Sequence, residues 1–188
     1  MNKKLLILLL SICTIAFWSS CVDDDDDYVI DEEWKAYQDD LVAKVAANSS
    51  GYNNISSNSN NGNIYLKEIT DFVPDKAGDQ FDRTLSPLFT DSVYVHYEGW
   101  YYKLDGDSII FDTTEGTNAN GYYARFKVNG LTDGFATALQ NMTEGQQRLV
   151  CIPQKLGYGA YGSGSIPGYT TLWFKIKLKK VKKAGIDF

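Results

Sequence analysis

The stretch from Leu156 to Pro167 reads Leu-Gly-Tyr-Gly-Ala-Tyr-Gly-Ser-Gly-Ser-Ile-Pro. Its glycines and serines favour tight turns, but a flexible linker would have no use for Tyr158, Tyr161 and Ile166. The stretch also ends just before the most regular strand pattern in the chain. We therefore interpret it as a shaped loop and not as a linker.

The strand after this loop has a period of two. Leu172, Phe174, Ile176 and Leu178 alternate with Trp173 and three lysines, which predicts one buried face and one solvated face. Helical spacing predicts one short helix over 134–142. Further strands are expected at 64–69, 92–102, 109–111, 124–128 and 147–152. Because the repeated helices of a parallel sheet do not occur, this order predicts an α+β domain over 64–183, an antiparallel five- to six-stranded sheet curled around one short helix.

Residues 1–20 have the features of a targeting segment. Two lysines precede an apolar run over 5–17, which is too short to span a bilayer comfortably, and Cys21 follows small residues. This resembles a bacterial lipoprotein signal peptide, in which such a cysteine is lipidated. The alternative is a short uncleaved anchor. We expect a protein of the cell envelope, attached to the membrane through a lipid on Cys21.

Five aspartates, Asp23 to Asp27, follow this cysteine, and we expect 21–30 to be an extended acidic tether. The run also resembles the export signal of surface lipoproteins of the Bacteroidetes type. That resemblance implies an outer-membrane lipoprotein. Whether the domain faces the periplasm or the outside stays open, and simple solvation is an equally good reason for the aspartates.

Residues 31–46 have helical periodicity, because Trp34, Tyr37, Leu41 and Val45 are spaced three or four apart. This amphipathic helix has one apolar face that needs a partner. Either it packs on the domain that follows, or it forms a homodimer contact. Residues 47–63 are rich in Asn, Ser and Gly and have no hydrophobic period, so we expect a linker there.

Composition excludes several kinds of chemistry. The net charge is −6, and the acidic excess lies near the N-terminus, so no basic face is expected that could bind a nucleic acid. With His96 as the single histidine and three cysteines, neither a zinc cluster nor a His-dependent nucleophile is expected, and no cofactor is implied. We interpret Cys151 as a small packing residue.

Several separated motifs occur in the order found in FKBP-type peptidyl-prolyl cis-trans isomerases, and the chain resembles this family over about 64–182. The motifs are Val95-His-Tyr-Glu-Gly-Trp100, Phe111-Asp-Thr-Thr114, Gly134-Phe135, Ile152-Pro153, Tyr158-Gly159, Ile166-Pro167 and Phe174. The resemblance implies a hydrophobic pocket, between the sheet and the helix, that receives proline. Phe135 stands where much of the family has Trp.

The resemblance also implies which residues form this pocket. Its catalytic residues would be Tyr97, Asp112, Tyr158 and Phe174, and its substrate-binding residues Phe111, Leu131, Thr132, Phe135 and Ile166. The Tyr158 hydroxyl would donate to a substrate carbonyl, and the backbone of Leu131 and Thr132 would hold the peptide. The implied activity is isomerisation of X-Pro bonds in exported or unfolded polypeptides.

This chemistry suits a chain without a nucleophile or metal set, because rotation about an amide needs neither. A twisted amide has lost its resonance and is less polar than the planar form, so an apolar cavity can favour it. The alternative is a non-catalytic binding or chaperone module with the same fold. Exposed tyrosines at 101, 102, 122 and 123 would favour that second function.

Overall fold

The computed structural model describes residues 31–47, 51–70, 80–114 and 123–185. The expected signal segment 1–20 and the tether 21–30, with Cys21, lie outside the described residues. Asp31–Phe188 forms one compact unit with its own hydrophobic core. Within the described ranges, no helix is long and apolar enough to cross a membrane.

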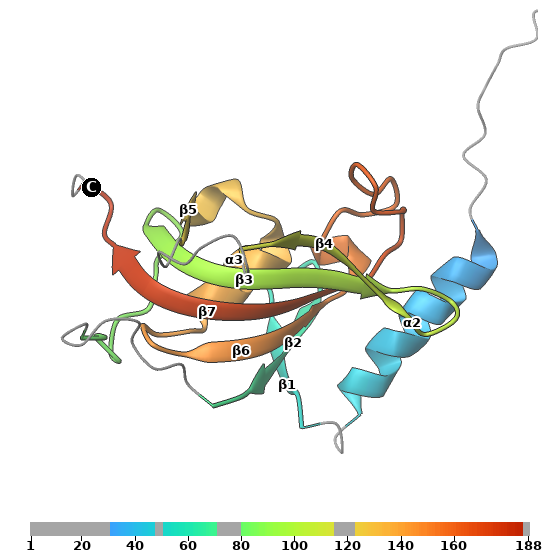
Figure 1. The fold of residues 1–188 in the computed structure, drawn as a ribbon, viewed down its shortest axis with the longest axis horizontal. Coiled ribbons are helices and arrows are strands. Elements are labelled where there is room, and N and C mark those ends of the chain that lie inside the picture. Colours follow the sequence, from blue (N-terminus) through green and yellow to red (C-terminus); the bar gives the residue numbers. More distant parts are fainter. Residues whose placement is uncertain (1–30, 48–50, 71–79, 115–122, 186–188) are drawn as a thin grey trace, which may run out of the picture. The chain divides into compact units, whose positions relative to one another are not determined.

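The described strands form one antiparallel sheet of seven strands, in the order β1-β2-β6-β7-β3-β4, with β5 also paired to β3 (Figure 1). Long β3 pairs with β7 along one side; along the other side its first half pairs with β5 and its second half with β4. The strand bounds are β1 Asn53–Ser56, β2 Asn63–Glu68, β3 Ser92–Tyr102, β4 Ser108–Thr113, β5 Ala124–Lys127, β6 Gln147–Ile152 and β7 Leu172–Lys182.

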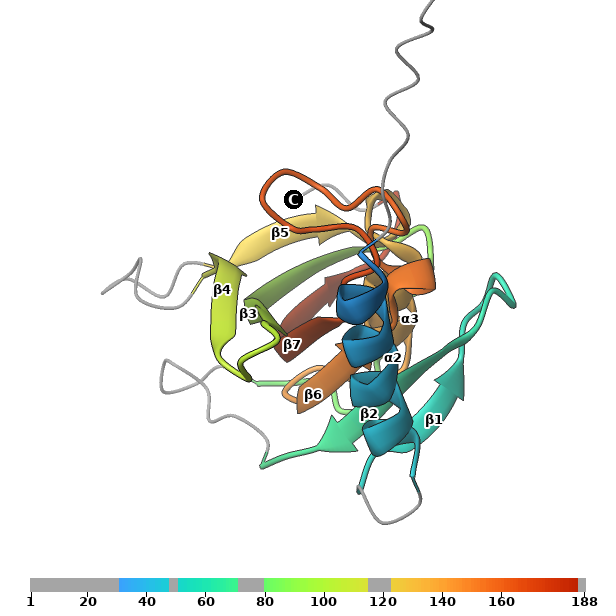
Figure 2. The ribbon, with the colours of Figure 1, turned by 90° about the vertical axis from the view of Figure 1, so that its right-hand side faces the viewer.

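The sheet curves around helix α3, Asp133–Gln140 (Figure 2). Phe135, Ala138 and Leu139 of this helix are buried in the core. Gly134 lets the helix approach β6, because a Cβ at this position would lie only 2.3 Å from Cγ2 of Ile152. Two 3-10 turns, Val128–Gly130 and Gln154–Leu156, precede the helix and follow β6 respectively. The α+β architecture predicted from the sequence is therefore confirmed, with more strands than expected.

The additional strand comes from the residues expected to be a linker. Within 47–63, Asn53–Ser56 forms β1 and pairs with β2, so the linker prediction is wrong for this part. Its only apolar residue, Ile55, packs against the core, and one apolar side chain in four shows no period. The Asn- and Ser-rich residues that follow form a tight turn in which Asn60 has a φ of 60°.

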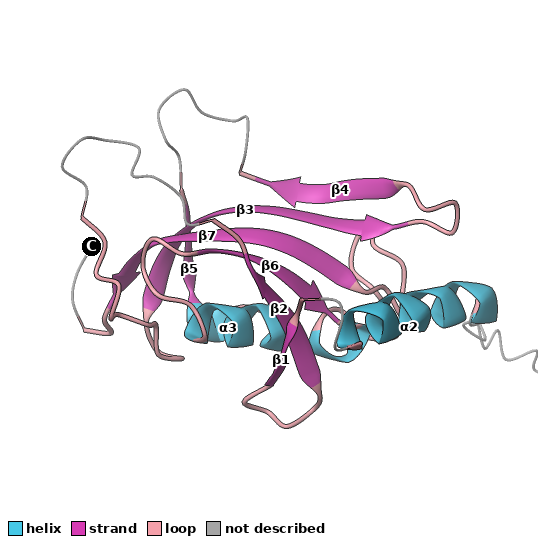
Figure 3. Ribbon diagram, turned by 90° about the horizontal axis from the view of Figure 1, so that it is seen from below, coloured by secondary structure: helices cyan, strands magenta, loops and turns pink. Residues whose placement is uncertain are grey.

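Helix α2, Glu32–Ala46, is capped at its N-terminus by Asp31, whose side chain accepts a hydrogen bond from the Trp34 amide at 2.9 Å. It lies across one end of the sheet (Figure 3). Gln38, a polar residue that the apolar period leaves out, is its most deeply buried side chain, with 1% exposed. The helix thus docks on its own domain, one of the two expected alternatives. A homodimer through the same helix stays a prediction.

The docked helix changes the outer face of β7. Trp173 was expected on a solvated face, but only 8% of it is exposed, because it packs with Val45 of α2 and with Cys151 of β6. Tyr52 and Tyr102 contact its ring edge to face, at centroid distances of 6.3 and 5.5 Å. Cys151 is fully buried in the same cluster, so its interpretation as a packing residue is confirmed.

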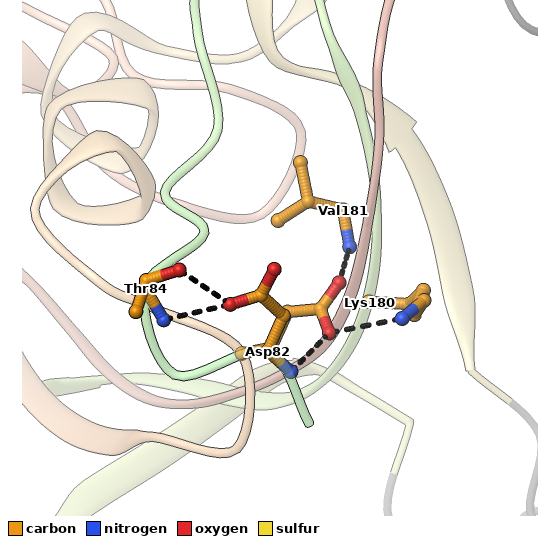
Figure 4. A network of polar contacts seen from close by, with 5 residues as sticks. Asp82, Thr84, Lys180 and Val181 are labelled. Carbon is orange, nitrogen blue, oxygen red and sulfur yellow. Dashed lines mark hydrogen bonds and ion pairs between the residues drawn. The ribbon is translucent and has the colours of Figure 1, made fainter. Parts of the chain in front are cut away.

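Two buried carboxylates hold residues 80–91 against β7. Glu144, fully buried, accepts hydrogen bonds from the amides of Asp82 at 2.9 Å and Val181 at 2.8 Å, and from Lys180 Nζ at 3.0 Å. Figure 4 shows these donors around a carboxylate, beside the contacts from Thr84 to Asp82. Asp91 is bound in the same way, by the amides of residues 88 and 184 and by Lys183 Nζ. This segment is therefore firmly placed.

Candidate functional site

A cavity of about 270 Å³ opens between the curved sheet, α3 and the loop after β6. Its walls come from β3, β4, β5, β7, α3 and two connecting segments, one between β5 and α3 and one between β6 and β7. The lining residues are Tyr97, Phe111, Asp112, Phe126, Gly130, Leu131, Thr132, Phe135, Tyr158 and Phe174. Most of them are aromatic or aliphatic, and the carboxylate and the hydroxyls are few.

The floor of the cavity consists of four rings that meet edge to face. Phe135 and Phe174 have centroids 4.9 Å apart at 90°, and Phe111 lies 5.6 Å from Phe174 at 88°. Tyr97 lies 5.9 Å from Phe135 at 83°. Edge-to-face contacts of this kind stabilise each pair by about 0.5–1.5 kcal/mol beyond burial. The rings are thereby held in one arrangement before any ligand enters.

Gly99 of β3 makes the contact between two of these rings possible. A Cβ at this position would lie 2.6 Å from Cε1 of Phe174 and 2.8 Å from Cζ of Phe111. Such distances are shorter than any real carbon–carbon contact of this type, so only glycine fits without movement of the rings. The register of β3 with β4 also shifts between Gly99 and Trp100. The glycine in the motif around Tyr97 therefore has a packing reason.

One hydrogen bond dominates the polar side of the cavity. The Tyr97 hydroxyl donates to Oδ2 of Asp112. Tyr97 is held in place by Thr114, whose hydroxyl accepts from the Tyr97 amide at 2.9 Å and whose own amide donates to the Tyr97 carbonyl at 2.9 Å. Since a carboxylate can accept several hydrogen bonds, Asp112 retains capacity for a donor on a ligand.

Tyr158 closes the cavity from the loop, with 38% of the residue exposed. Burial, followed by the charge of Asp112, raises the pKa of its hydroxyl. The group therefore remains a protonated donor at neutral pH. The loop is shaped as expected: its amides at 159 and 169 pair internally, and Gly162, with a φ of 72°, lies where a Cβ would be 2.1 Å from the carbonyl oxygen of residue 166.

The structure brings together eight of the nine predicted pocket residues. Ile166 is the exception, because it does not line the cavity. It forms a tight turn with Ser163, through mutual backbone hydrogen bonds of 2.9 and 3.0 Å, and its side chain is 7% exposed within the main core. Ile166 of the Ile-Pro motif therefore packs in the core and does not line the cavity. An irregular loop has no periodic pattern, so the sequence did not indicate which way this side chain points.

Two lining residues, Phe126 and Gly130, were not predicted. Phe126 lies 5.8 Å from the Tyr97 ring and 6.4 Å from the Phe135 ring, so it extends the aromatic wall. On the four-residue strand β5, Phe126 is half-buried between two exposed residues. In the sequence, apolar residues alternate with basic ones over this strand, and this alternation could have indicated that Phe126 faces the cavity. For Gly130, which ends the turn before α3, no signal in the sequence distinguishes it from an ordinary turn glycine.

Helix α2 supports two sides of this cavity from outside. Trp34 donates from Nε1 to the carbonyl of Gly168 at 2.9 Å, at the end of the Tyr158 loop. The same indole meets Tyr101 edge to face at 6.1 Å, and Tyr101 stacks on Phe111 at 6.4 Å. A continuous set of ring contacts thus connects the helix with the cavity wall. Among the described residues, no group of three or more His, Cys, Asp and Glu side chains could hold a metal ion.

Residues 86–179, half of the chain, match the family model described as FKBP-type peptidyl-prolyl cis-trans isomerase. The FKBP-type 22 kDa peptidyl-prolyl cis-trans isomerase of Escherichia coli is 42% identical over 96 residues, which cover 50% of this chain and 43% of the relative. The peptidyl-prolyl cis-trans isomerase FKBP15-3 of Arabidopsis thaliana is 40% identical over 90 residues, covering 48% and 59%. The chain thus spans about half the length of these relatives.

Solved structures share the fold over a longer part of the chain. The crystal structure of FkpA from Escherichia coli has a TM-score of 0.60 at 25% identity, covering 81% of this chain and 61% of that one. The peptidyl-prolyl cis-trans isomerase of Pseudomonas syringae has a TM-score of 0.58 at 25% identity, covering 81% and 95%. The family model matches half of the chain, the motifs occur in the order of the family, and the cavity is aromatic. This chain therefore belongs to the family of FKBP-type peptidyl-prolyl cis-trans isomerases.

Proposed function

We propose that the chain catalyses cis-trans isomerisation of X-Pro bonds in exported or unfolded polypeptides, with the aromatic cavity as its proline pocket. The observation that carries this proposal is the preformed set of rings around about 270 Å³, with Asp112 and two tyrosine hydroxyls at its polar side. Membership of the isomerase family supports it.

The cavity would act by favouring the twisted amide. Rotation about the bond costs roughly 18–20 kcal/mol because the planar form is stabilised by resonance. The twisted form is less polar, and rings such as Phe135 and Phe174 surround it with apolar surface where water would favour the planar form. No bond to the protein forms, and no proton transfer is needed.

Three polar features would fix the peptide while the bond rotates. The Tyr158 hydroxyl, kept protonated, would donate to a carbonyl of the substrate. The Asp112 carboxylate, oriented by Tyr97, would lie against the positive edge of the rotating amide. The backbone of Leu131 and Thr132 lies beside the cavity and would hold the flanking chain. Each contact orients the peptide without making the cavity polar.

Cis-to-trans relaxation of a proline tetrapeptide, followed with the purified full chain, tests the activity. We expect acceleration over buffer, and a decrease of about ten- to hundredfold in kcat/KM for Asp112→Ala and Tyr158→Phe, as expected for one hydrogen bond to a charged or reacting group. Tyr161→Phe, in the same loop with 85% of the residue exposed, and Asp105→Ala, in an exposed turn, are matched controls. No acceleration, or equal loss in the controls, would refute the proposal.

A non-catalytic binding module is the second candidate. Exposed apolar side chains at Leu88, Phe89 and Ile110 favour it, with 60%, 54% and 55% of each exposed. Three of the four tyrosines expected to be exposed do not favour it, because Tyr101 is buried, Tyr102 packs on Trp173 and Tyr123 is half-buried. Tyr122 lies outside the described residues. Suppression of client aggregation that persists in Asp112→Ala would support this function, and suppression abolished by that change would refute it.

We also propose that the domain is attached to the outer membrane through a lipid on Cys21, with 21–30 as a tether. The lipoprotein-like segment before that cysteine supports this location. Incorporation of labelled fatty acid that disappears in Cys21→Ser would confirm the anchor, and unchanged incorporation would refute it. Protease treatment of intact cells distinguishes a surface-exposed domain, which is cleaved, from a periplasmic one.

A further inference from the structure

A second cavity, of about 500 Å³, lies next to the proline pocket and shares Leu131 with it. Its apolar walls are Leu131, the face of α3 at Ala136, and the ring of Phe89. The complete lining is Asn58, Ser59, Phe89, Leu131, Asp133, Ala136 and Gln140. Because 54% of Phe89 is exposed, a ligand that covers its side chain would gain the free energy of apolar burial.

The polar side of this second cavity is built and already hydrogen bonded. Asn58 Nδ2 donates to Oε1 of Gln140 at 2.9 Å, and the Ser59 hydroxyl donates to Oδ2 of Asp133. These two contacts tie the turn between β1 and β2 to helix α3. The wall therefore exists before a ligand binds, and its side chains need no hydrogen bond from one.

The two walls of the second cavity come from different parts of the chain. The turn that supplies Asn58 and Ser59 precedes the part that matches the isomerase family, residues 86–179. The opposite wall, Phe89, belongs to the segment that Glu144 and Asp91 hold against β7. The β1–β2 turn and the segment that carries Phe89 thus line the second cavity together with α3, and neither of these two segments forms the floor of the proline pocket.

We propose that the second cavity binds a large apolar side chain of the same polypeptide whose proline occupies the first, an assignment that rests on the proposed function. Because Leu131 lines both cavities, an extended peptide at about 3.3 Å per residue would place this side chain roughly two to four residues from the proline. The lining favours Leu, Ile, Met or Phe. Asp133, the one charged lining residue, disfavours an acidic side chain.

A double-mutant cycle between peptide and protein tests the assignment. Six labelled peptides carry one Leu at position two, three or four before or after a central proline, in an Ala and Ser background, and each is compared with the same peptide carrying Ala. Affinity for the full chain is measured by fluorescence anisotropy. At one position we expect Leu to bind about tenfold more tightly than Ala, as burial of an apolar side chain implies. Glu at that position ought to abolish the gain.

Phe89→Ala should remove the preference for Leu. Leu88→Ala, its equally exposed neighbour that does not line the cavity, should retain the preference. An equal preference in all three proteins, or none at any of the six positions, would overturn the assignment. Isomerisation of the same peptides distinguishes this assignment from the proposed function. Phe89-dependent binding without isomerisation would refute the proposed isomerase activity and retain the assignment of the second cavity. Isomerisation without the preference for Leu would refute the assignment of the second cavity alone.

Discussion

The side-chain oxygen of Gln38 accepts a hydrogen bond from the backbone amide of Thr171 at 2.9 Å, although 133 residues separate the two. The Thr171 hydroxyl donates to the Gln38 carbonyl at 3.2 Å, and Nε2 of Gln38 donates to the carbonyl of Tyr102 at 2.9 Å. One buried amide thus joins α2 to the end of β3 and to the start of β7, where the loop that carries Tyr158 ends.

Gln38→Ala should lower the free energy of unfolding by about 1–3 kcal/mol, because the Thr171 amide and the Tyr102 carbonyl would lose a partner in the interior. It should also raise KM in the tetrapeptide assay, since the loop loses its attachment to the helix. Urea unfolding and steady-state kinetics measure the two effects. Asp39→Ala, at an exposed position of the same helix, is the control and should change the stability by less than about 0.5 kcal/mol.

Gly99→Ala should reshape the proline pocket. The added methyl would displace Phe111 and Phe174, and such overpacking costs about 1–3 kcal/mol. We expect a lower midpoint in urea and a lower kcat/KM. Gly130→Ala is the stability control, because a Cβ there would meet no other atom within 4 Å. Equal stability of the two variants would contradict this packing role.

Asp91→Asn should destabilise the domain in a pH-dependent way. Burial alone would raise the pKa of Asp91, but hydrogen bonds from the Leu88 amide, Lys183 and the Ala184 amide hold the pKa below its usual value of 3.8. A carboxylate with a lowered folded pKa stabilises the fold above the unfolded pKa, and this contribution is lost as pH falls through the folded value.

The difference between wild type and Asp91→Asn in urea should therefore be about 1–3 kcal/mol at pH 7 and decrease below pH 4 or so. Asp107→Asn replaces a carboxylate whose side chain is 78% exposed and should cost less than about 0.5 kcal/mol at either pH. A difference between wild type and Asp91→Asn that is constant across this range would contradict the assignment.

Cys151 should be unreactive in the folded protein. Burial raises the pKa of its thiol, and the side chain is fully covered by the cluster around Trp173. In a chain with Cys13→Ser and Cys21→Ser, a thiol reagent at pH 8 should modify Cys151 only as fast as the domain opens, and immediately in 6 M urea. Rapid modification without denaturant would show that α2 does not cover this face.

The elements that the sequence predicts well are those with a regular period or a motif. The alternation in β7, the spacing in α3 and the ordered motifs around Tyr97, Asp112 and Phe135 placed most of the sheet, the helix and eight of nine pocket residues. The parts that were missed have too few apolar residues to show a period. β1 contains one, and its turn has the composition of a linker.

The sequence by itself determined the α+β class, the family and the aromatic pocket, because periodicity and ordered motifs are local properties of the chain. Only the tertiary structure decided what covers each face. It placed α2 over Trp173, turned Ile166 into the core and enclosed a second cavity between the β1–β2 turn, α3 and Phe89. These outcomes depend on contacts between residues far apart in the chain, such as Gln38 with Thr171, and no local pattern records such contacts.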